Sequence, residues 1–386
     1  MQDIDKKRIG IGLIGGGFMA KSHSNAYHTI PYIYNNSRFY TDLVAIGEID
    51  SERAEIAKKR YGFERAAVGY MDVIDDPRVD LVDICVDDAL HATIALAAIE
   101  RGKHILCEKP LALNADDAKQ LRDAANQKGV VAMTGFNYRF VSAVVLAKRL
   151  IESGVMGKVY HFRGDYLQDV GAFEETPIEK LWYAYGSKSS GVALGLGTHL
   201  IDMARFLVGE IEEVCGMLPN YNPVRESANG PVSVTTEEDM LLLARFNRGA
   251  TGTMRASAIS SGRKNCLRWE ISCSKGSLAF ELENLNELCV FLKDTPVHSV
   301  TGFTRVNVTQ MDRDHPFMDV WWPRGHIVGW EHAHINEIAH LLDCIAGDKP
   351  IAPIGADFED GYRSIKIVDT LRTSAKGGCF SKVIYS

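Results

Sequence analysis

Two residues far apart in the sequence have side chains suited to acid–base chemistry. Lys109 stands in the segment GKHILCEKPLAL, and His199 stands in GLGTHLIDMARF, three residues before Asp202. Oxidation of an alcohol needs a base for the hydroxyl proton, and either side chain can serve. A cationic ring beside Lys109 would favour the neutral amine, whereas its neighbour Glu108 would favour the ammonium. Taken alone, Lys109 could equally be a surface residue beside a turn, and His199 a core residue.

A glycine-rich segment near the N-terminus points to a nucleotide. Residues 15–20 read GGGFMA, which fits G-x-G-x-x-A, directly after the apolar run 8–14 and before a helical pattern. Glycines let the backbone approach a pyrophosphate, and the N-terminus of the helix supplies free N–H groups. The strand, loop and helix order is the context that this fingerprint requires. We therefore expect dinucleotide binding, with contacts from Gly15, Gly17, Phe18 and Met19.

An acidic residue decides between NAD and NADP in such a fold. Glu48 stands at the end of the second predicted strand (43–49), and Asp50 follows it. The spacing from Gly15 exceeds the usual ~20 residues, because the segment 31–41 lengthens the first crossover. A carboxylate at this place binds ribose hydroxyls and repels a 2′-phosphate, and the nearest base is Arg53. Glu48 thus favours NAD, although a solvated glutamate at a strand end is the alternative.

Composition narrows the class of protein. The chain has 386 residues and a net charge of −7, which argues against a nucleic-acid-binding surface. No stretch approaches the roughly 20 apolar residues of a membrane helix. The eight cysteines are dispersed and form no Cys-x-x-Cys pair, which is typical of reduced thiols in a cytoplasmic protein. The length predicts two domains.

The elements that must position these residues change character after about residue 140. Apolar strands alternate with helices up to residue 134, which predicts an α/β domain with a Rossmann-type, doubly wound parallel sheet. Beyond it, segments rich in β-formers and separated by turns predict an α+β domain with a large, mostly antiparallel open sheet. We place the NAD-binding domain at residues 1–138 and a substrate-binding and oligomerisation domain at 139–386. The β-rich segments are 158–166, 238–246, 250–257, 267–273 and 277–281, and helices are expected at 144–152, 197–207 and 331–345.

The motifs together resemble a known family. The start GLIGGGFMAKSH, the CEKP element, GFNYRF at 135–140 and GTHLIDMARF at 197–206 resemble the Gfo/Idh/MocA oxidoreductases, across both expected domains. Within that family, IGLIGGGFMAKSHSNAY and FRGDYLQD resemble the levoglucosan dehydrogenase branch. That branch, like the related C-glycoside-oxidising enzymes, oxidises a secondary hydroxyl at position 3 of a sugar.

The resemblance implies roles for individual residues. It implies that Lys109 is the family's catalytic lysine, that His199 is its catalytic histidine, and that the peptide before Pro110 is commonly cis. It implies a sugar, polyol or glycoside as the small-molecule partner, without nucleic acid or membrane. Apart from the resemblance, an open sheet needs its outer face covered, so we expect a homo-oligomer (dimer, tetramer or hexamer) through the C-terminal sheet. Further cofactor contacts are expected from Asp87, His91, Glu108 and Lys109, and substrate contacts from Tyr138, Arg139, Tyr166, Gln168, Trp182 and Asp202.

Two departures from the family pattern bear on the substrate. Many relatives have Asp four residues before the histidine, whereas this chain has Gly195. Asp165, Asp169 or Lys188 could replace the lost carboxylate, or the space could admit a bulkier substrate. Relatives also often have T-P-N after the third strand, where this chain has Val-Asp-Asp at 86–88.

Other functions remain as alternatives. An inositol or polyol dehydrogenase and a C-glycoside 3-oxidising enzyme with tightly bound NAD use the same residues. A non-catalytic NAD-binding regulator would keep the glycine loop and lose the chemistry. A metalloenzyme has less support, because no His-x-x-x-His or Cys-x-x-Cys spacing occurs, so no metal is expected. Its candidate ligands would be His315, His326, His332, His334 and His340.

Overall fold

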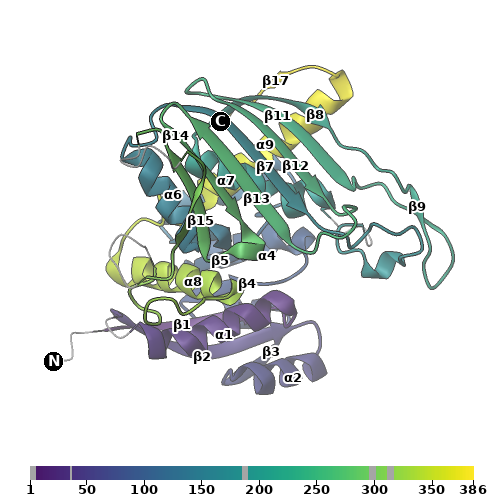
Figure 1. The fold of residues 1–386 in the computed structure, drawn as a ribbon. Helices are drawn as coiled ribbons and strands as arrows, with labels where there is room; N and C mark the ends of the chain where they lie inside the picture. The colour runs from purple at the N-terminus through teal and green to yellow at the C-terminus, as the bar shows by residue number, and fades with distance from the viewer. Residues whose placement is uncertain (1–5, 35–36, 185–189, 295–300, 311–316) are drawn as a thin grey trace. The chain divides into compact units, whose positions relative to one another are not determined.

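The chain divides into two compact units, each built from two segments of sequence (Figure 1). The computed structural model describes residues 6–34, 37–184, 190–294, 301–310 and 317–386. Unit 1 comprises Met1–Phe140 and Gly329–Tyr362, and unit 2 comprises Val141–Val328 and Arg363–Ser386. The expected boundary after residue 138 lies close to the first break. The structure differs from the expected continuous second domain, 139–386, because the chain returns to unit 1 at Gly329.

Unit 1 contains the doubly wound parallel sheet that the sequence predicts. Its strands run in the order β3-β2-β1-β4-β5-β6, and every neighbouring pair is parallel. Most residues of β1 and all of β4 are buried, as expected of strands covered on both faces. The strands are β1 (Lys7–Ile14), β2 (Phe39–Glu48), β3 (Arg65–Val68), β4 (Leu81–Ile84), β5 (His104–Glu108) and β6 (Ala132–Gly135).

The helices of unit 1 fall into two groups. Helix α1 contacts α2 and α8, whereas α4 contacts α3 and α5. Helix α1 continues through Pro31, so part of the segment expected to lengthen the first crossover is helical. The helices are α1 (Phe18–Ile33), α2 (Ser51–Tyr61), α3 (Tyr70–Ile74), α4 (His91–Glu100), α5 (Ala115–Lys128) and α8 (Trp330–Gly347), with short 3₁₀ turns η1 (Asp88–Leu90) and η2 (Asn137–Phe140).

Unit 2 contains a nine-stranded sheet in the order β16-β15-β14-β13-β7-β12-β11-β8-β17. All neighbouring strands are antiparallel except β7 and β12, so the sheet is mostly antiparallel but is no simple meander. A separate hairpin pairs β9 (Val224–Arg225) with β10 (Val232–Ser233). The strands of the large sheet are β7 (Val159–Leu167), β8 (Ile211–Met217), β11 (Asp239–Phe246), β12 (Thr251–Ser257), β13 (Cys266–Cys273), β14 (Gly276–Glu281), β15 (Glu287–Leu292), β16 (Thr304–Asn307) and β17 (Ser381–Lys382).

Helices cover one face of this sheet. Figure 1 shows α6 (Ser142–Glu152), α7 (Thr198–Leu207) and α9 (Phe358–Gly377) behind the strands. The contacts are close where the strands carry glycine: a Cβ at Gly164 of β7 would lie 3.1 Å from Leu200 of α7, and one at Gly216 of β8 would lie 2.8 Å from Leu371 of α9. Three shorter helical segments are η3 (Ile178–Lys180), the π-helical η4 (Ala193–Gly197) and η5 (Leu282–Asn284).

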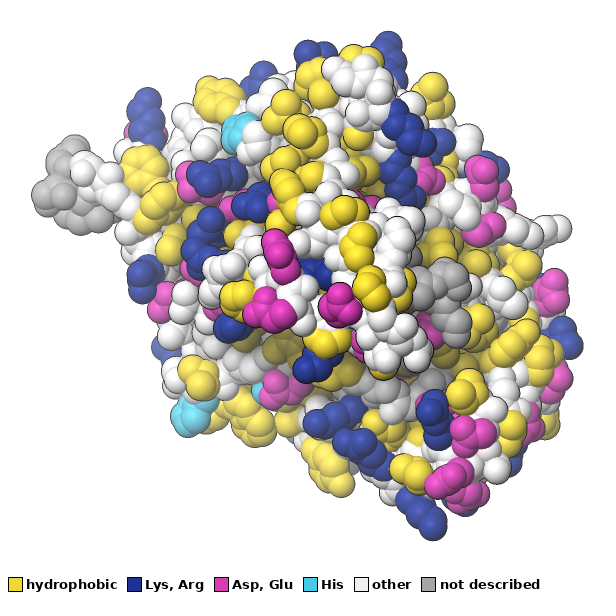
Figure 2. Space-filling view, turned by 90° about the vertical axis from the view of Figure 1, so that its right-hand side faces the viewer, with side chains coloured by type: hydrophobic (Ala, Val, Ile, Leu, Met, Phe, Trp, Pro, Cys, Tyr) yellow, Lys and Arg dark blue, Asp and Glu magenta, His cyan; other side chains and the backbone are white. Residues whose placement is uncertain are grey.

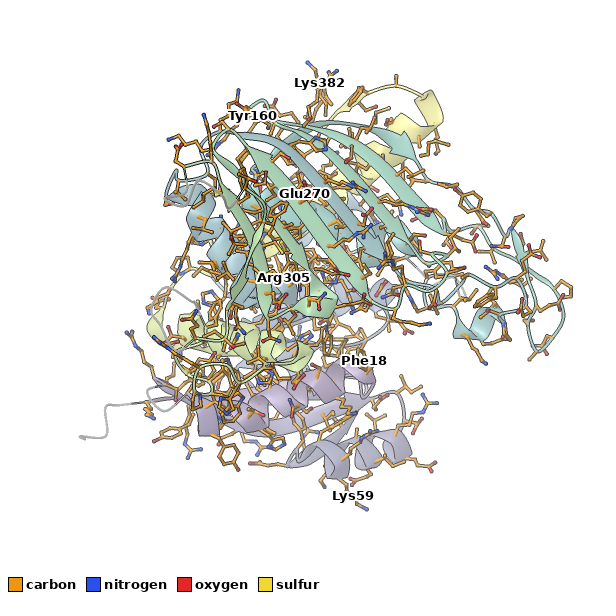
Figure 3. All side chains as sticks on the ribbon, viewed as in Figure 1. Phe18, Lys59, Tyr160, Glu270, Arg305 and Lys382 are labelled. Atoms are coloured by element: carbon orange, nitrogen blue, oxygen red, sulfur yellow. The ribbon has the colours of Figure 1, made fainter. Side chains whose placement is uncertain are left out.

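The opposite face of the nine-stranded sheet carries charged side chains together with exposed apolar ones such as Met217 and Leu243. Glu270 of β13 and Arg305 of β16 lie on the side turned to the viewer in Figure 3. On the face drawn in Figure 2, acidic and basic side chains are intermixed and form no extended field of one sign. Among the residues that the structure describes, no helix is both long and apolar enough to cross a membrane.

Candidate active site

The turn between β1 and α1 requires glycine at its first position. Gly15 has a φ of +100°, and a Cβ there would lie 2.3 Å from the carbonyl oxygen of Cys85. An L side chain is therefore excluded both by backbone conformation and by space. The Gly15 N–H donates to the carbonyl of Gly47 at 2.9 Å, which fixes the turn against β2.

The N-terminus of α1 is open to an anion. Gly17 is the N-cap residue; within the described residues no side chain caps the helix, and its first turn holds no acidic residue. A Cβ at Gly17 would meet nothing within 4 Å. The first N–H groups of a helix lack partners inside it and favour negative charge. Phe18 is exposed and stacks on Trp330 of α8, with ring centroids 5.5 Å apart. Met19 follows on α1.

Glu48 lies beside this turn, and Asp50 does not share its role. A Cβ on Gly16 would be 2.7 Å from the Oε1 atom of Glu48, so the carboxylate borders the glycine turn. Asp50 instead caps α2 by accepting from the Arg53 N–H at 2.8 Å. Arg53 also forms an ion pair with Asp50 at 3.5 Å. Arg53, the basic residue nearest to Glu48 in the sequence, is thus paired with Asp50. Glu48 is the acidic residue next to the glycine turn.

The segment after β4 connects to the turn that carries Lys109. Asp87 precedes η1, and His91 begins α4. The His91 ring is buried, with Nδ1 2.7 Å from the carbonyl oxygen of Pro110 and Nε2 3.1 Å from that of Val86. Both ring nitrogens therefore contact backbone, and His91 holds the two loops together.

Lys109 directly follows β5, and the Lys109–Pro110 peptide is cis. Glu108 is buried, and its Oε2 accepts the backbone N–H of Lys109 at 3.1 Å. Burial alone would raise the pKa of Glu108, but the neighbouring His23, and after it the charge of Lys109, outweigh burial and hold that pKa at about 2. Glu108 is consequently ionised at neutral pH.

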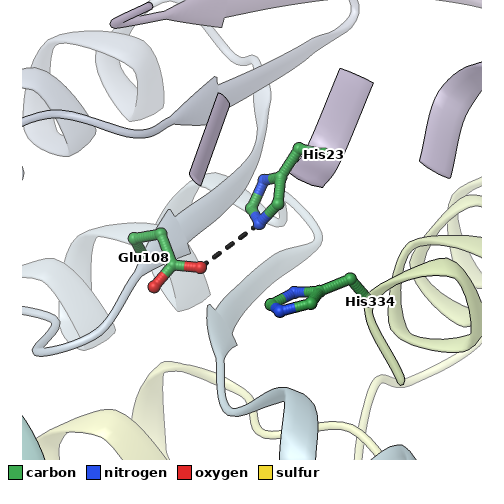
Figure 4. Close-up of side chains that lie close together, drawn as sticks. All are labelled: His23, Glu108 and His334. Carbon is green, nitrogen blue, oxygen red and sulfur yellow. Dashed lines mark ion pairs between the residues drawn. The ribbon is translucent and has the colours of Figure 1, made fainter. Parts of the chain in front are cut away.

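A buried group of polar side chains lies beneath this turn, and the sequence did not single it out. His23, Asp83, Glu108 and His334 come from α1, β4, β5 and α8 and are each at most 5% exposed. Figure 4 shows the ion pair between His23 and Glu108, with His334 beside them. The signal for His23 is its position in AKSH, on the inner side of the helix that follows the glycine loop.

Two predicted substrate residues, Tyr138 and Arg139, lie in η2 of unit 1. Arg139 is 2% exposed; its guanidinium donates to Asp360 at 2.9 Å and to the carbonyl of Gly355 at 3.2 Å. The Tyr138 hydroxyl accepts from the indole N–H of Trp330 at 3.4 Å. Arg139 thus forms a buried ion pair within unit 1, which favours a structural role over the expected substrate contact.

His199 lies in the first turn of α7 in unit 2, directly after the π-helical η4. Its ring is 7% exposed and meets the ring of Tyr166 edge-on, at a centroid distance of 5.8 Å. The Tyr166 hydroxyl and the Gln168 amide both donate to Oδ1 of Asn265, at 2.8 and 3.0 Å. Asn265 was missed by the sequence analysis, because no motif marks an asparagine in a loop.

Trp182 occupies the space beside Gly195. A Cβ on Gly195 would lie 2.2 Å from Cζ3 and 2.5 Å from Cη2 of the indole. The indole is 41% exposed, so it offers a surface as well as filling space. The aromatic ring therefore stands where the family pattern would place an aspartate side chain.

The other acidic residues considered for the substrate site differ in their burial and in their partners. Asp202 is 1% exposed on α7. Asp165 alternates with Tyr166 on β7, so the two side chains point to opposite faces, and Asp165 pairs with Arg268 at 3.0 Å. Asp169 pairs with Lys264 at 2.6 Å. Lys188 lies outside the described residues.

The residues that could bind a metal in the structure differ from the five histidines that the sequence suggested. His315 lies outside the described residues, and His340 contacts the carbonyl of Ile351 at 2.9 Å. Of the four that the structure describes, His334 alone lies in a group of possible ligands, together with His23 and Glu108, whose ligand atoms all lie within 4.8 Å of one another.

Family models match most of both units. The model described as an oxidoreductase family with an NAD-binding Rossmann fold (GFO_IDH_MocA) matches residues 9–136. The GFO/IDH/MocA C-terminal domain model matches residues 144–279.

Individual relatives match over nearly the whole chain. Levoglucosan dehydrogenase of Pseudarthrobacter phenanthrenivorans is 37% identical over 96% of both chains. Glucose-6-phosphate 3-dehydrogenase of Bacillus subtilis is 32% identical over 93% of this chain and 94% of its own. A solved structure of levoglucosan dehydrogenase in complex with NADH and levoglucosan superposes with a TM-score of 0.93 and 36% identity, covering 98% of this chain and 100% of that one.

Proposed function

Because the chain belongs to the Gfo/Idh/MocA family of NAD-binding oxidoreductases, we propose that it moves a hydride between NAD and the C3 hydroxyl of a sugar or glycoside. The observation that carries this proposal is the full-length likeness to levoglucosan dehydrogenase, whose solved complex holds NADH and levoglucosan. The name of a second relative, glucose-6-phosphate 3-dehydrogenase, specifies the same ring position.

The described residues of unit 1 fit a dinucleotide. The open N-terminus of α1 after Gly17 would take the pyrophosphate, and Glu48 would take the ribose hydroxyls. Gly15 brings the backbone close, and Phe18 and Met19 begin the helix that borders the pyrophosphate. Asp87 and His91 follow β4, Glu108 ends β5, and Lys109 follows it, all at the carboxyl edge of the sheet where such cofactors bind.

Lys109 and His199 supply the proposed acid–base chemistry. Bound NAD would supply the acceptor for the hydride of the carbinol carbon. As the C–H bond breaks, Nζ of Lys109 takes the hydroxyl proton and the C–O bond becomes a carbonyl. His199 donates a hydrogen bond to the reacting oxygen or relays the proton. The reverse reaction returns the proton from the lysine ammonium to the product oxygen.

The substrate contacts proposed in unit 2 suit a sugar. Tyr166, Gln168 and Asp202 offer hydroxyl, amide and carboxylate partners, and Trp182 offers an aromatic face. Tyr138 and Arg139 keep a proposed role, although the contacts of Arg139 described above favour a structural one.

The test of this function begins with the cofactor. The purified protein is denatured, and any released nucleotide is identified, which also shows whether NAD stays bound between turnovers. Levoglucosan, inositols, hexoses and O- and C-glycosides are then screened by NADH absorbance, with and without a 3-keto-sugar acceptor. We expect turnover of a pyranose with product oxidised at C3. Turnover of inositols alone would support the polyol alternative, and NAD binding without any turnover would support the regulator.

Two variants test the catalytic assignment. Lys109→Ala and His199→Ala should each lower kcat at least 100-fold, which is the usual contribution of a positioned acid or base. NADH binding, measured by fluorescence, should persist in His199→Ala. Unchanged turnover in both variants would refute the mechanism.

We also propose a cytoplasmic homo-oligomer. All eight cysteines are free thiols in the structure, which suits a reducing compartment. The uncovered face of the nine-stranded sheet has a hollow of about 540 Å³ whose lining includes Met217, Leu241 and Leu243. Apolar side chains on an uncovered sheet face favour contact with another subunit.

A further inference from the structure

We propose that His23 is a positioning residue for the reaction: acting through Glu108, it fixes the charge and the backbone of the turn that carries Lys109. The inference rests on the proposed role of Lys109 as the base. Asp83 completes the chain of contacts, which runs Asp83–His23–Glu108–Lys109 through the interior of unit 1.

The geometry joins four elements of unit 1. His23 is fully buried on α1, with Nδ1 2.9 Å from Oδ1 of Asp83 on β4. Its Nε2 lies 3.2 Å from Oε1 of Glu108 at the end of β5 (Figure 4). The ring N–H is not directed straight at that oxygen, so the contact is a charge pair at close range. One imidazole thus lies between two buried carboxylates.

The charge states follow from these neighbours. Burial opposes a charge on His23, but Asp83 and the other adjacent groups outweigh it and raise the pKa of His23 well above its usual value. His23 is therefore an imidazolium, and it keeps Glu108 ionised. His334 differs: burial first, and then the charge of His23, lower its pKa to about 3, so it is neutral.

Glu108 connects His23 to the backbone of Lys109. Its Oε1 faces His23, whereas its Oε2 accepts the backbone N–H of Lys109 at 3.1 Å. A Cβ added at Gly135 of β6 would lie only 3.0 Å from Oε1, so β6 closes the other side of the carboxylate. The carboxylate cannot turn without losing His23 or the Lys109 N–H. The turn thereby gains a fixed negative charge one residue from the proposed base.

Other groups that face His23 and Glu108 complete the electrostatic setting. Tyr27 donates to Oδ2 of Asp83 at 2.9 Å, and Sγ of Cys85 lies 3.3 Å from Nδ1 of His23. Burial raises the pKa values of Tyr27 and Cys85, so both are neutral. From α8, His334 and the buried Glu337 face the group. His23 is thus the cation that lies between Asp83 and Glu108.

A metal ion is the competing explanation for the same residues. His23, Glu108 and His334 could offer three ligand atoms. The imidazolium accounts for the short contacts with both carboxylates without an ion, and Nε2 of His334 is already 3.1 Å from the Asn137 amide. Elemental analysis of the purified protein decides this point, because stoichiometric zinc or another divalent metal would overturn the proposal.

The main experiment compares His23→Gln, Glu108→Gln and the double variant with wild type. His28→Gln is the matched control, since His28 is an exposed histidine on the same helix. The readouts are kcat and KM for the sugar, the pH dependence of kcat/KM, and NADH affinity by fluorescence. Without His23, which holds the pKa of Glu108 low, the buried Glu108 carboxylate should take up a proton.

We expect kcat to fall about tenfold in His23→Gln, equivalent to about 1.4 kcal/mol, with the sugar KM within about twofold of wild type. The acidic limb of kcat/KM should move about one pH unit lower, because the negative charge beside the proposed base is lost. Glu108→Gln should give the same shift, and the double variant should add nothing further. His28→Gln should match wild type.

The outcomes separate this inference from the proposed function. If Lys109→Ala keeps turnover, the proposed function fails, whatever the other variants do. If Lys109→Ala abolishes turnover but His23→Gln and Glu108→Gln keep the wild-type pH profile, the positioning role fails alone. If His23→Gln does not fold, the nearly isosteric Glu108→Gln decides by the same pH profile. Additive effects in the double variant would also overturn the inference.

Discussion

Trp182 and Gly195 show how one residue change can reshape a substrate site. The indole lies where any side chain at 195 would begin. An aspartate there would offer a carboxylate to a sugar hydroxyl, whereas the tryptophan offers an exposed aromatic face. The glycine and the tryptophan are therefore coupled, and neither can be exchanged without affecting the other.

Substitution at Gly195 should test this coupling. Gly195→Ala and Gly195→Asp should displace the Trp182 ring, and we expect kcat/KM for the best glycoside to fall about tenfold or more. Gly195→Asp combined with Trp182→Gly should recover part of this loss for small sugars, since the space is then free. Steady-state kinetics on paired small and bulky substrates measure the effect. A loss in the double variant equal to the sum of the losses in Gly195→Asp and Trp182→Gly would show that the two positions are independent.

Glu48 carries the expected preference for NAD. Glu48→Ser removes the carboxylate that borders Gly16, together with its repulsion of a 2′-phosphate. We expect the NADH dissociation constant to rise about tenfold or more, as for a lost hydrogen bond to a charged group, and NADPH binding to improve. Fluorescence titration with both cofactors measures this. An unchanged ratio of the NADH and NADPH dissociation constants would show that Glu48 does not select the cofactor through its ribose.

At this scale the sequence predicted residues that belong to local motifs. Gly15 and the acid beside it could be predicted because strand, turn and helix follow one another in the chain. His23 and Asn265 could not, because their partners come from strands and loops distant in the sequence. The role of Arg139 depended on Asp360, more than 200 residues away, and only the folded chain brings those charges together.

At the scale of elements, α8 shows that position in the sequence does not determine the unit to which a helix belongs. Its position late in the sequence placed it in the expected second domain, but it packs against α1 in unit 1. Its pattern predicted a helix at 331–345, close to the observed Trp330–Gly347. Local periodicity identifies a helix, whereas the unit to which it belongs depends on long-range packing. Helix α9 and the strands β8 and β15–β17 were not predicted, and the edge strand β17 has only two residues.

The burial of His334 on α8 should make unit 1 sensitive to acid. Burial lowers the pKa of His334 to about 3 in the folded chain, whereas an unfolded histidine titrates near about 6.5. A depressed folded pKa contributes stability above pH ~6.5 that is lost as the pH falls towards 3. Between pH 6.5 and 4 this loss amounts to about 3 kcal/mol.

His334→Gln should remove this pH dependence. Its deficit in unfolding free energy relative to wild type should therefore shrink as the pH falls from 7 to 4. Urea titrations at several pH values, followed by a probe in unit 1, measure the difference, with His28→Gln as control. A gap between wild type and His334→Gln that stays constant with pH would refute the assignment.

At the scale of the whole molecule, the two sheets differ in how their faces are covered. Helices and segments of unit 1 surround the parallel sheet, and its buried strands could be recognised from continuous apolar runs. Within the described part of the chain, the nine-stranded sheet has helices on one face only. Its strand order could not be predicted, because β7 inserts between β13 and β12 and pairs with β12 in parallel. The alternation along β11 nevertheless marks an outward row that includes Leu241 and Leu243.

That outward row should take part in self-association. Leu243 is 47% exposed and Met217 is 61% exposed, and both line the hollow on the uncovered sheet face. Leu243→Asp would place a charge in a subunit contact, where desolvation without a partner is costly. We expect wild type to be oligomeric by light scattering after size exclusion, and Leu243→Asp to shift towards smaller species. Ile56→Asp, at an apolar position on α2 that is 57% exposed, should keep the wild-type mass. A monomeric wild type, or equal masses for all three proteins, would exclude this face as the interface.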